Sequence, residues 1–142
     1  MISLATWILW VHILAAAVWL GGAAMVRLAV LPLAEEARAA AARRGHFLTS
    51  RAMEILILTG LVNILFKGLE SSFALSAGFY AMLAIKMALL AIMVGMQIWM
   101  GIAWRRGEIE LPDATRRARL GLTAQCVLGA VAALLGLGLR AV

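Results

Sequence analysis

Two ionisable residues, His12 and Lys86, lie inside long apolar stretches of this sequence. Stretches of this kind are typical of membrane spans, and an ionisable side chain within a span is costly unless it has a function and a partner. An imidazole nitrogen and a neutral amine can each donate an electron pair to a metal. We therefore interpret the pair as the two axial ligands of one heme iron, whose potential such ligands tune.

The elements that must position this pair are four apolar stretches, at about residues 4–31, 47–66, 74–104 and 118–139. Each can cross a hydrocarbon core of about 30 Å at about 1.5 Å per residue. Of the 142 residues, 65% are hydrophobic and 14% are charged, far from the composition of a soluble domain. Because the connections are short, the sequence predicts one all-α domain over residues 1–142, an integral membrane four-helix bundle. The Ala/Arg/Glu-rich segment 35–44 is expected to form a short helix on the membrane surface.

The positive charge of the chain, formally +6, gathers around two of the three connections. The arginines there are Arg27, Arg38, Arg43, Arg44 and Arg51, and Arg105, Arg106, Arg116, Arg117 and Arg119. The opposite side has only Lys67, with Arg140 near the C-terminus. The positive-inside rule predicts a multi-pass protein of a bacterial-type inner membrane with its Arg-rich connections in the cytoplasm and both termini in the periplasm. The expected partner is a lipid bilayer and no nucleic acid, since the charge is explained by topology.

The predicted topology brings His12 and Lys86 to similar depths. They lie about 12 Å and about 18 Å below the external ends of their helices. Both helices descend from the same side, and Cα–Cβ bonds tilt toward a helix N-terminus, so the long lysine side chain extends toward the level of His12. A desolvated lysine is also more readily neutral and available to a metal. We expect the two residues to face each other across one heme b.

Three further residues bear on this site. His46 falls in the basic connection or at the start of the second stretch, about 18 Å from His12 along the bundle, which is too far to share an iron. We interpret it as an interfacial residue. Trp19 shares a helix face with His12, beside small residues that leave room for a flat macrocycle. Arg27 is expected either to clamp a heme propionate or to anchor the helix at the cytoplasmic interface.

A methionine face on the third stretch keeps copper open as an alternative cofactor. At about 100° per residue, Met82, Met93 and Met100 lie within about 40° of Lys86. Thioethers suit Cu(I), although methionine also fills gaps in ordinary cores. A copper-handling protein would use this face with His12. In a third hypothesis, the chain is a purely structural module in which His12 and Lys86 only hydrogen-bond between helices.

Two other patterns have structural and functional interpretations. Glu54 can pair with Arg51 three residues earlier, or it can handle protons. In the last stretch, small residues recur at four-residue spacing, as in Gly129 with Ala133 and Ala132 with Gly136. Such spacing lets another backbone approach closely, so this stretch is expected to close the bundle or to join two bundles in a homodimer.

Short motifs resemble two related groups of membrane proteins. The first-helix pattern is His12-x6-Trp19-x-Gly21-Gly22 followed by Val26-Arg27-Leu28, and it is similar to the copper resistance D (CopD) membrane domain and to HemJ-type protoporphyrinogen oxidases. Residues 58–63, Leu-Thr-Gly-Leu-Val-Asn, resemble the second CopD helix, and Tyr80-x5-Lys86 resembles the lysine-bearing helix of both groups.

The HemJ resemblance implies a four-helix protein that binds heme b through the residues matching His12 and Lys86 and oxidises protoporphyrinogen IX to protoporphyrin IX. The CopD resemblance implies copper uptake or tolerance. Together with the residue pair, they favour a heme b protein with a redox role, in electron transfer or porphyrinogen oxidation. If the chain is an enzyme, it is expected to be a heme oxidoreductase of this kind.

Overall fold

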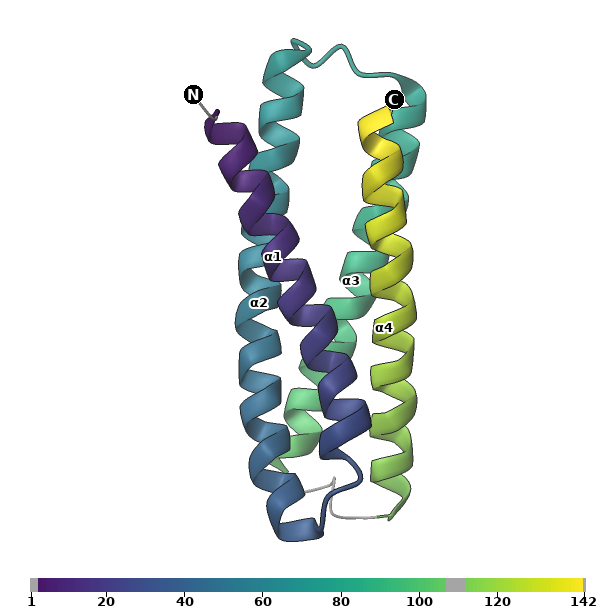
Figure 1. Ribbon diagram of the computed structural model, residues 1–142. Coiled ribbons are helices and arrows are strands. Elements are labelled where there is room, and N and C mark those ends of the chain that lie inside the picture. Colours follow the sequence, from purple (N-terminus) through teal and green to yellow (C-terminus); the bar gives the residue numbers. More distant parts are fainter. Residues whose placement is uncertain (1–2, 107–111, 142) are drawn as a thin grey trace.

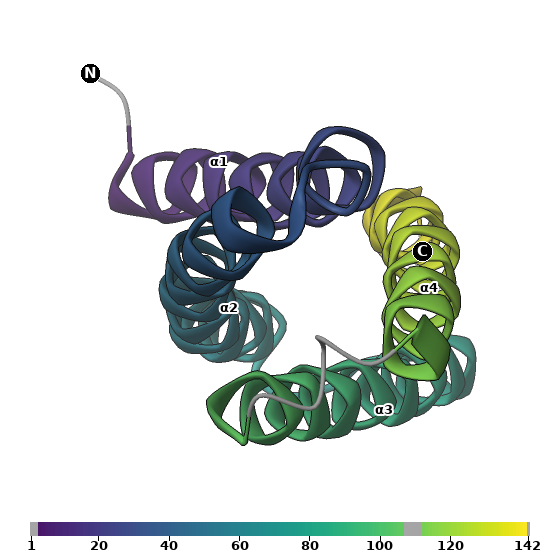
Figure 2. The same ribbon diagram turned by 90° about the horizontal axis from the view of Figure 1, so that it is seen from below.

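The protein is a bundle of four long helices, as Figure 1 shows from the side and Figure 2 from one end. A computed structural model describes residues 3–106 and 112–141. In chain order the elements are α1 (Leu4–Met25), the π-helical turn η1 (Val26–Val30), α2 (Glu35–Glu70), α3 (Ala77–Arg105) and α4 (Pro112–Ala141). The part of the chain that is described has no strand. The all-α, four-helix prediction is confirmed.

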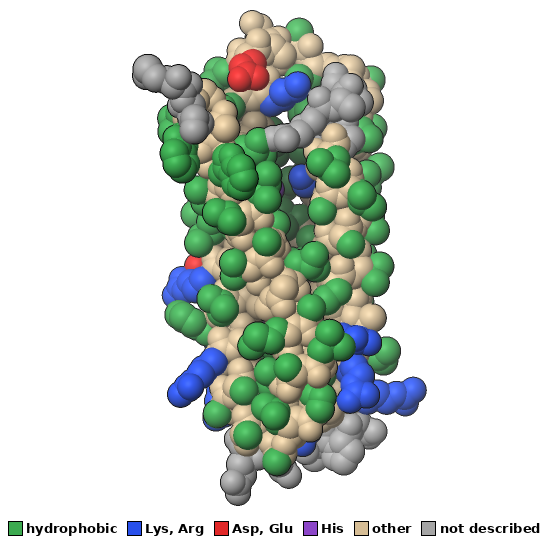
Figure 3. Space-filling model, viewed as in Figure 1, with side chains coloured by type: hydrophobic (Ala, Val, Ile, Leu, Met, Phe, Trp, Pro, Cys, Tyr) green, Lys and Arg blue, Asp and Glu red, His purple; other side chains and the backbone are tan. Residues whose placement is uncertain are grey.

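All four helices are long and apolar enough to cross a membrane. Within the described residues the candidate spans are Leu4–Val30, Ala37–Glu70, Ala77–Arg105 and Thr115–Leu137. The outer surface is largely apolar (Figure 3), and large side chains such as Trp10 and Leu28 are mostly exposed on it. A soluble protein does not expose so much contiguous apolar area, whereas lipid solvates it readily.

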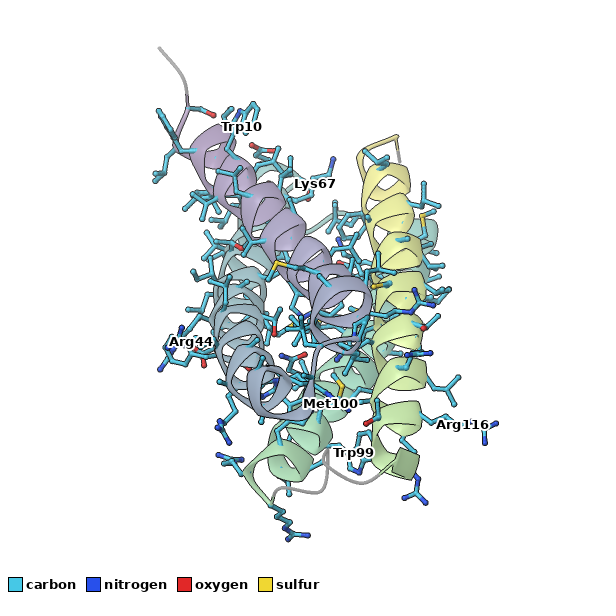
Figure 4. All side chains as sticks on the ribbon, turned by 60° about the horizontal axis from the view of Figure 1, so that its bottom comes forward. Trp10, Arg44, Lys67, Trp99, Met100 and Arg116 are labelled. Atoms are coloured by element: carbon cyan, nitrogen blue, oxygen red, sulfur yellow. The ribbon has the colours of Figure 1, made fainter. Side chains whose placement is uncertain are left out.

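The two ends of the bundle differ in charge. The start of α1 and the end of α4 lie at the same end of the bundle as the turn between α2 and α3 (Figure 1). Lys67 lies toward this end, which we call the Lys67 end, while Arg44 and Arg116 project outward nearer the other (Figure 4). We call that other end, where most Lys and Arg atoms of Figure 3 gather, the Arg-rich end. The side chain of Arg140 lies outside the described residues.

Local signals in the sequence set the ends of the helices. The hydroxyl of Ser3 accepts a hydrogen bond from the Thr6 amide at the start of α1, and Ser76 caps α3 in the same way. After α2 the chain turns through Phe73, which has a φ of 60° and donates its amide to the carbonyl of Gly68 at 2.7 Å. A Cβ on Gly68 would lie 2.5 Å from the Phe73 ring, so this close approach requires glycine.

The second helix is longer than the sequence predicts. α2 begins at Glu35 and ends at Glu70, whereas the apolar stretch covers only residues 47–66. The segment 35–44, expected as a separate surface helix, is the first part of α2. Hydropathy falls there because of the arginines, but alanine and arginine are both strong helix formers and no proline interrupts the backbone. His46 was expected in the connection or at the first turn of the second helix, and it lies instead about three turns into α2.

The packed core lies in the half of the bundle toward the Arg-rich end. Buried hydrophobic residues there form two clusters. The cluster nearer the Arg-rich end comprises Ala23, Val26, Val30, Leu31, Ala42, Met100, Trp104, Ala118 and Leu122. The second cluster comprises Trp19, Ala52, Met53 and Met93. In the half toward the Lys67 end, the buried hydrophobic residues among those described are Ala15 and Phe79. α1 packs mainly on α2, and α3 on α4. Figure 3 shows the surface hollowed between α1 and α4 in the weakly packed half.

Candidate functional site

His12 lies in this weakly packed half, where its ring is held between α1 and α2. Its Nδ1 atom is 2.9 Å from Oγ1 of Thr59. The ring packs against α2 at Gly60. A Cβ on Gly60 would lie 3.3 Å from Cε1 of His12, so the glycine allows this close contact. The ring is half-buried. Residues 59 and 60 of α2 thus hold the imidazole in one orientation.

The hydrogen bonds of Thr59 determine which ring nitrogen of His12 carries the proton. The Thr59 hydroxyl donates to the carbonyl of Ile55 at 2.7 Å, so its oxygen accepts from His12. The carbonyl of Leu56 lies 3.3 Å from the same hydroxyl and is a second acceptor for its hydrogen. Nδ1 is therefore the protonated nitrogen, and Nε2 keeps its lone pair. Within the described part of the chain, Nε2 has no hydrogen-bond partner.

Lys86 extends from α3 toward α4. A Cβ on Gly136 would lie 3.0 Å from Nζ of Lys86, so the amine rests against the bare backbone of α4. Among the described residues, Lys86 has no hydrogen-bond or ion-pair partner. The side chain is half-buried and lies within electrostatic range of His12. The lone pair on Nε2 of His12 and the unpartnered amine of Lys86 thus lie in the same half of the bundle.

The surroundings of this pair leave space. Lys or Arg atoms, coloured blue, are visible inside the hollow between α1 and α4 in Figure 3. His12 lies in the first half of α1 and Gly136 near the end of α4, so both belong to this level of the bundle. Glycine at positions 60 and 136 keeps the walls beside both side chains free of Cβ atoms. Two nitrogen donors with glycine beside each of them thus lie in the same half of the bundle.

Trp19 lies two turns further along α1, where the packed core begins. It is 2% exposed and packs against Gly129 of α4, where a Cβ would lie 2.6 Å from the indole ring. The indole N–H is buried and makes no hydrogen bond with the described residues. Trp19 is thus primarily a core residue, with one donor still unused.

Arg27 does not lie near His12. They are fifteen positions apart, which corresponds to about 22 Å of helix. Arg27 belongs to η1 and donates from Nε to the Thr123 hydroxyl of α4 at 2.7 Å. This contact ties the first helix to the fourth near the Arg-rich end, and we do not include Arg27 in the His12–Lys86 site.

The methionine face is divided between two parts of the core. Met93 belongs to the cluster around Trp19, and Met100 to the cluster nearest the Arg-rich end, where it points into the bundle (Figure 4). Met82 is half-buried and outside both clusters. No group of three or more His, Cys, Asp or Glu side chains suited to a metal ion occurs among the described residues.

The structure also tests the expected Arg51–Glu54 ion pair and the expected packing role of the small residues of α4. Arg51 and Glu54 form the expected local ion pair, with a 2.7 Å contact and both side chains exposed. The small residues of α4 serve packing within the bundle, because Gly129 lies against Trp19 and Gly136 against Lys86. Closure of the bundle by α4 is confirmed, and a homodimer stays a prediction.

A second polar cluster, which we call the His46 cluster, joins three helices in the half toward the Arg-rich end. It comprises His46, Thr49 and Ser50 of α2, Gln97 and Trp104 of α3, and Gln125 of α4. Nε2 of Gln97 lies 2.8 Å from the Thr49 hydroxyl, 3.2 Å from that of Ser50 and 3.3 Å from Nδ1 of His46. Gln125 donates to Oε1 of Gln97 at 3.0 Å. The ring of His46 meets Trp104 edge to face, with 4.7 Å between ring centroids.

Sequence reasoning overlooked most of this cluster. Gln125 is completely buried, yet it was not singled out in the apolar stretch that contains it. One signal was available, because residues 46, 49 and 50 share a helix face once α2 is extended to include them. Gly101 leaves room for the ring of His46, but nothing in the sequence pattern around Gly101 indicates this contact. A Cβ there would lie 2.5 Å from Nε2 of His46.

Comparison with known proteins finds no matching family model, no similar curated protein and no similar solved structure. The site must therefore be interpreted from its own geometry.

Proposed function

We propose that this chain is a membrane heme b protein of the CopD/HemJ-like type, with the heme iron bound by Nε2 of His12 and Nζ of Lys86. The observation that supports this most strongly is the hydrogen bond from His12 to Thr59, which keeps the proton on Nδ1. Metal-binding histidines commonly have such a partner, which fixes the tautomer and the ring orientation. A structural histidine would have no need of a free Nε2 beside an unpartnered amine.

Each residue of the site has a defined part in the proposal. Thr59 orients His12, and Gly60 admits the ring close to α2. Lys86 supplies the second nitrogen from the other pair of helices, and it forms no ion pair with an acidic group among the described residues. The indole N–H of Trp19 is a donor available to the edge of a bound macrocycle. Bound heme would supply one-electron redox chemistry.

The redox role has two forms. A protein whose heme has two protein ligands suits electron transfer, because no coordination position is open to a substrate. Oxidation of protoporphyrinogen IX is proposed from the HemJ resemblance and requires an electron acceptor in the membrane. Incubating the loaded protein with protoporphyrinogen IX and a quinone, and following porphyrin fluorescence, distinguishes the two forms.

The test of heme binding is an absorption spectrum of protein purified from heme-replete cells. We expect a Soret band that is shifted or lost in both His12→Ala and Lys86→Met, and unchanged in position in His46→Gln as the matched control. A colourless wild-type protein would refute the proposal. So would a Soret band that neither ligand substitution alters.

Metal analysis of the same preparation separates heme from the copper alternative. We expect about one iron per chain and no stoichiometric copper. Bound Cu(I) that disappears when Met82, Met93 and Met100 are replaced by leucine would instead favour a copper-handling protein. Neither metal, with unchanged folding in His12→Ala, would favour the purely structural hypothesis.

A further inference from the structure

The His46 cluster has a hydrogen-bond arrangement that suits only one charge state of its histidine. Gln97 presents its amide nitrogen to Nδ1 of His46, so Nδ1 must accept. The other ring nitrogen, Nε2, lies 3.4 Å from Oγ of Ser50 and can donate to it. The arrangement therefore corresponds to a neutral imidazole protonated at Nε2. This is the opposite tautomer from that of His12.

A protonated His46 would conflict with this arrangement. Nδ1 would then carry a hydrogen that faces the N–H groups of Gln97. Rotating the Gln97 amide by 180° removes the conflict, because it places Oε1 toward His46 and Nε2 toward α4. The Thr49 hydroxyl, which now donates to the carbonyl of His46, must then turn to donate to Oε1 of Gln97. The rotated amide needs an acceptor on α4 in place of the donor that it contacts now.

Gln125 supplies that acceptor. Three buried side-chain polar atoms among the described residues lack a hydrogen-bond partner, and Oε1 of Gln125 is the one acceptor among them. Gln125 is completely buried, so water does not readily satisfy this atom. Rotating the Gln125 amide as well would bring Oε1 to Nε2 of Gln97. The atom that is unsatisfied with a neutral histidine is thus the one that a protonated histidine requires.

The position of the cluster favours access from the Arg-rich end. Close contacts pair Gly22 with Thr49 and Val26 with Gly45, so His46 lies level with the last turn of α1. By the same register it is about 20 Å from the level of His12 along the bundle. The inference therefore does not rest on heme binding.

Few charged groups face the His46 ring. Arg105 of α3 is the charged group that acts on it. α1 and α4 present Gly22 and Gln125 to the cluster, neither of which ionises. On α2 itself, the nearby Arg51 is paired with Glu54 on the outer surface. No carboxylate in the described residues contacts the ring, so the amides must stabilise an added proton.

We propose that His46 is a proton-binding site reached from the Arg-rich end, and that the amides of Gln97 and Gln125 rotate together when it takes up a proton. The site gives the bundle a proton acceptor separate from the His12–Lys86 pair. Its hydrogen bonds have two alternative arrangements, one for each charge state.

Nitrogen NMR of protein labelled at histidine with ¹⁵N, in lipid nanodiscs, tests the proposal directly. The chain has two histidines, and His46→Gln assigns their signals. At about pH 8 we expect His46 to carry its proton on Nε2, and near pH 5 on both nitrogens. The side-chain amide signals of Gln97 and Gln125 should shift with the same midpoint. A proton on Nδ1 at high pH, no uptake over this range, or amides that do not follow would each overturn the proposal.

Substitutions at Gln97 sharpen the test. In Gln97→Glu the side chain can only accept when ionised, so the midpoint of His46 should rise by at least about one pH unit. Gln97→Leu should abolish the preference for Nε2. The matched control is Asn63→Asp, an amide-to-acid change about 25 Å away along α2, which should leave the midpoint unchanged. An unchanged midpoint in Gln97→Glu would contradict the proposed contact.

Discussion

At the scale of single residues, the neighbours of His12 and Lys86 determine the tautomer of the histidine and the position of the lysine amine. The pair itself was predictable, because two ionisable residues in apolar stretches stand out in any sequence. Thr59 was predictable only as a residue able to hydrogen-bond between helices. Its choice of partner, and hence the tautomer of His12, depends on the register of α1 against α2, which no pattern within one helix contains.

The hydroxyl at position 59 provides a test of the tautomer argument. Thr59→Val removes the acceptor of the Nδ1 proton while keeping the size of the side chain. We expect heme affinity to fall by about 10-fold to 100-fold, as for other second-layer partners of metal-binding histidines. Titration of purified apoprotein with heme, followed at the Soret band, measures this. Thr59→Ser retains the hydroxyl and should bind nearly as wild type does, and equal loss in both variants would contradict the argument.

Gly136 provides a separate test of the place of Lys86. In Gly136→Leu the new side chain occupies the space beside Nζ, and Lys86 must turn away from α4. We expect a shifted Soret band, because the lysine ligand is displaced. Gly95→Leu on α3 is the control, since no atom lies within 4 Å of a Cβ there. A spectrum identical to wild type in Gly136→Leu would place the amine elsewhere.

At the scale of elements, hydropathy predicted how many helices there are better than where they begin. The arginines before residue 47 lower hydropathy without interrupting a helix, so α2 extends to Glu35. Because the predicted helix began too late, His46 was expected outside the bundle interior and the His46 cluster was not predicted. The pairing of Trp19 with Gly129 was equally out of reach, because it depends on how α1 and α4 are placed in space.

The contact between α1 and α4 gives a stability prediction. A Cβ on Gly129 would lie 2.6 Å from the rigid indole ring of Trp19, whereas a Cβ on Gly121 has its nearest neighbour at 3.6 Å. Gly129→Ala should therefore destabilise the fold by about 1–3 kcal/mol through overpacking. Gly121→Ala should be neutral or slightly stabilising, since alanine favours helix. Reversible unfolding in mixed detergent micelles measures both, and equal stabilities would contradict this packing.

At the scale of the whole molecule, the charge asymmetry predicts an orientation. A reporter enzyme that is active only outside the cytoplasm should be active when fused after Val142. It should be inactive when inserted between Arg106 and Pro112, on the Arg-rich side. The reverse pattern would place the arginines outside and invert the proposed topology. Substituting glutamine for the arginines of both connections should weaken the orientation preference.

The uneven distribution of the core also bears on assembly. One half of the bundle is closed by interlocking side chains, and the other is held mainly by its helix pairs. Under the proposed function, the chain would insert and fold first and receive heme afterwards, with the closed half as a fixed frame. A ligand that fills the other half acts as its missing core and stabilises the folded state by mass action. The order of events in biogenesis would then be membrane insertion, folding of the Arg-rich half, and loading from the hollow.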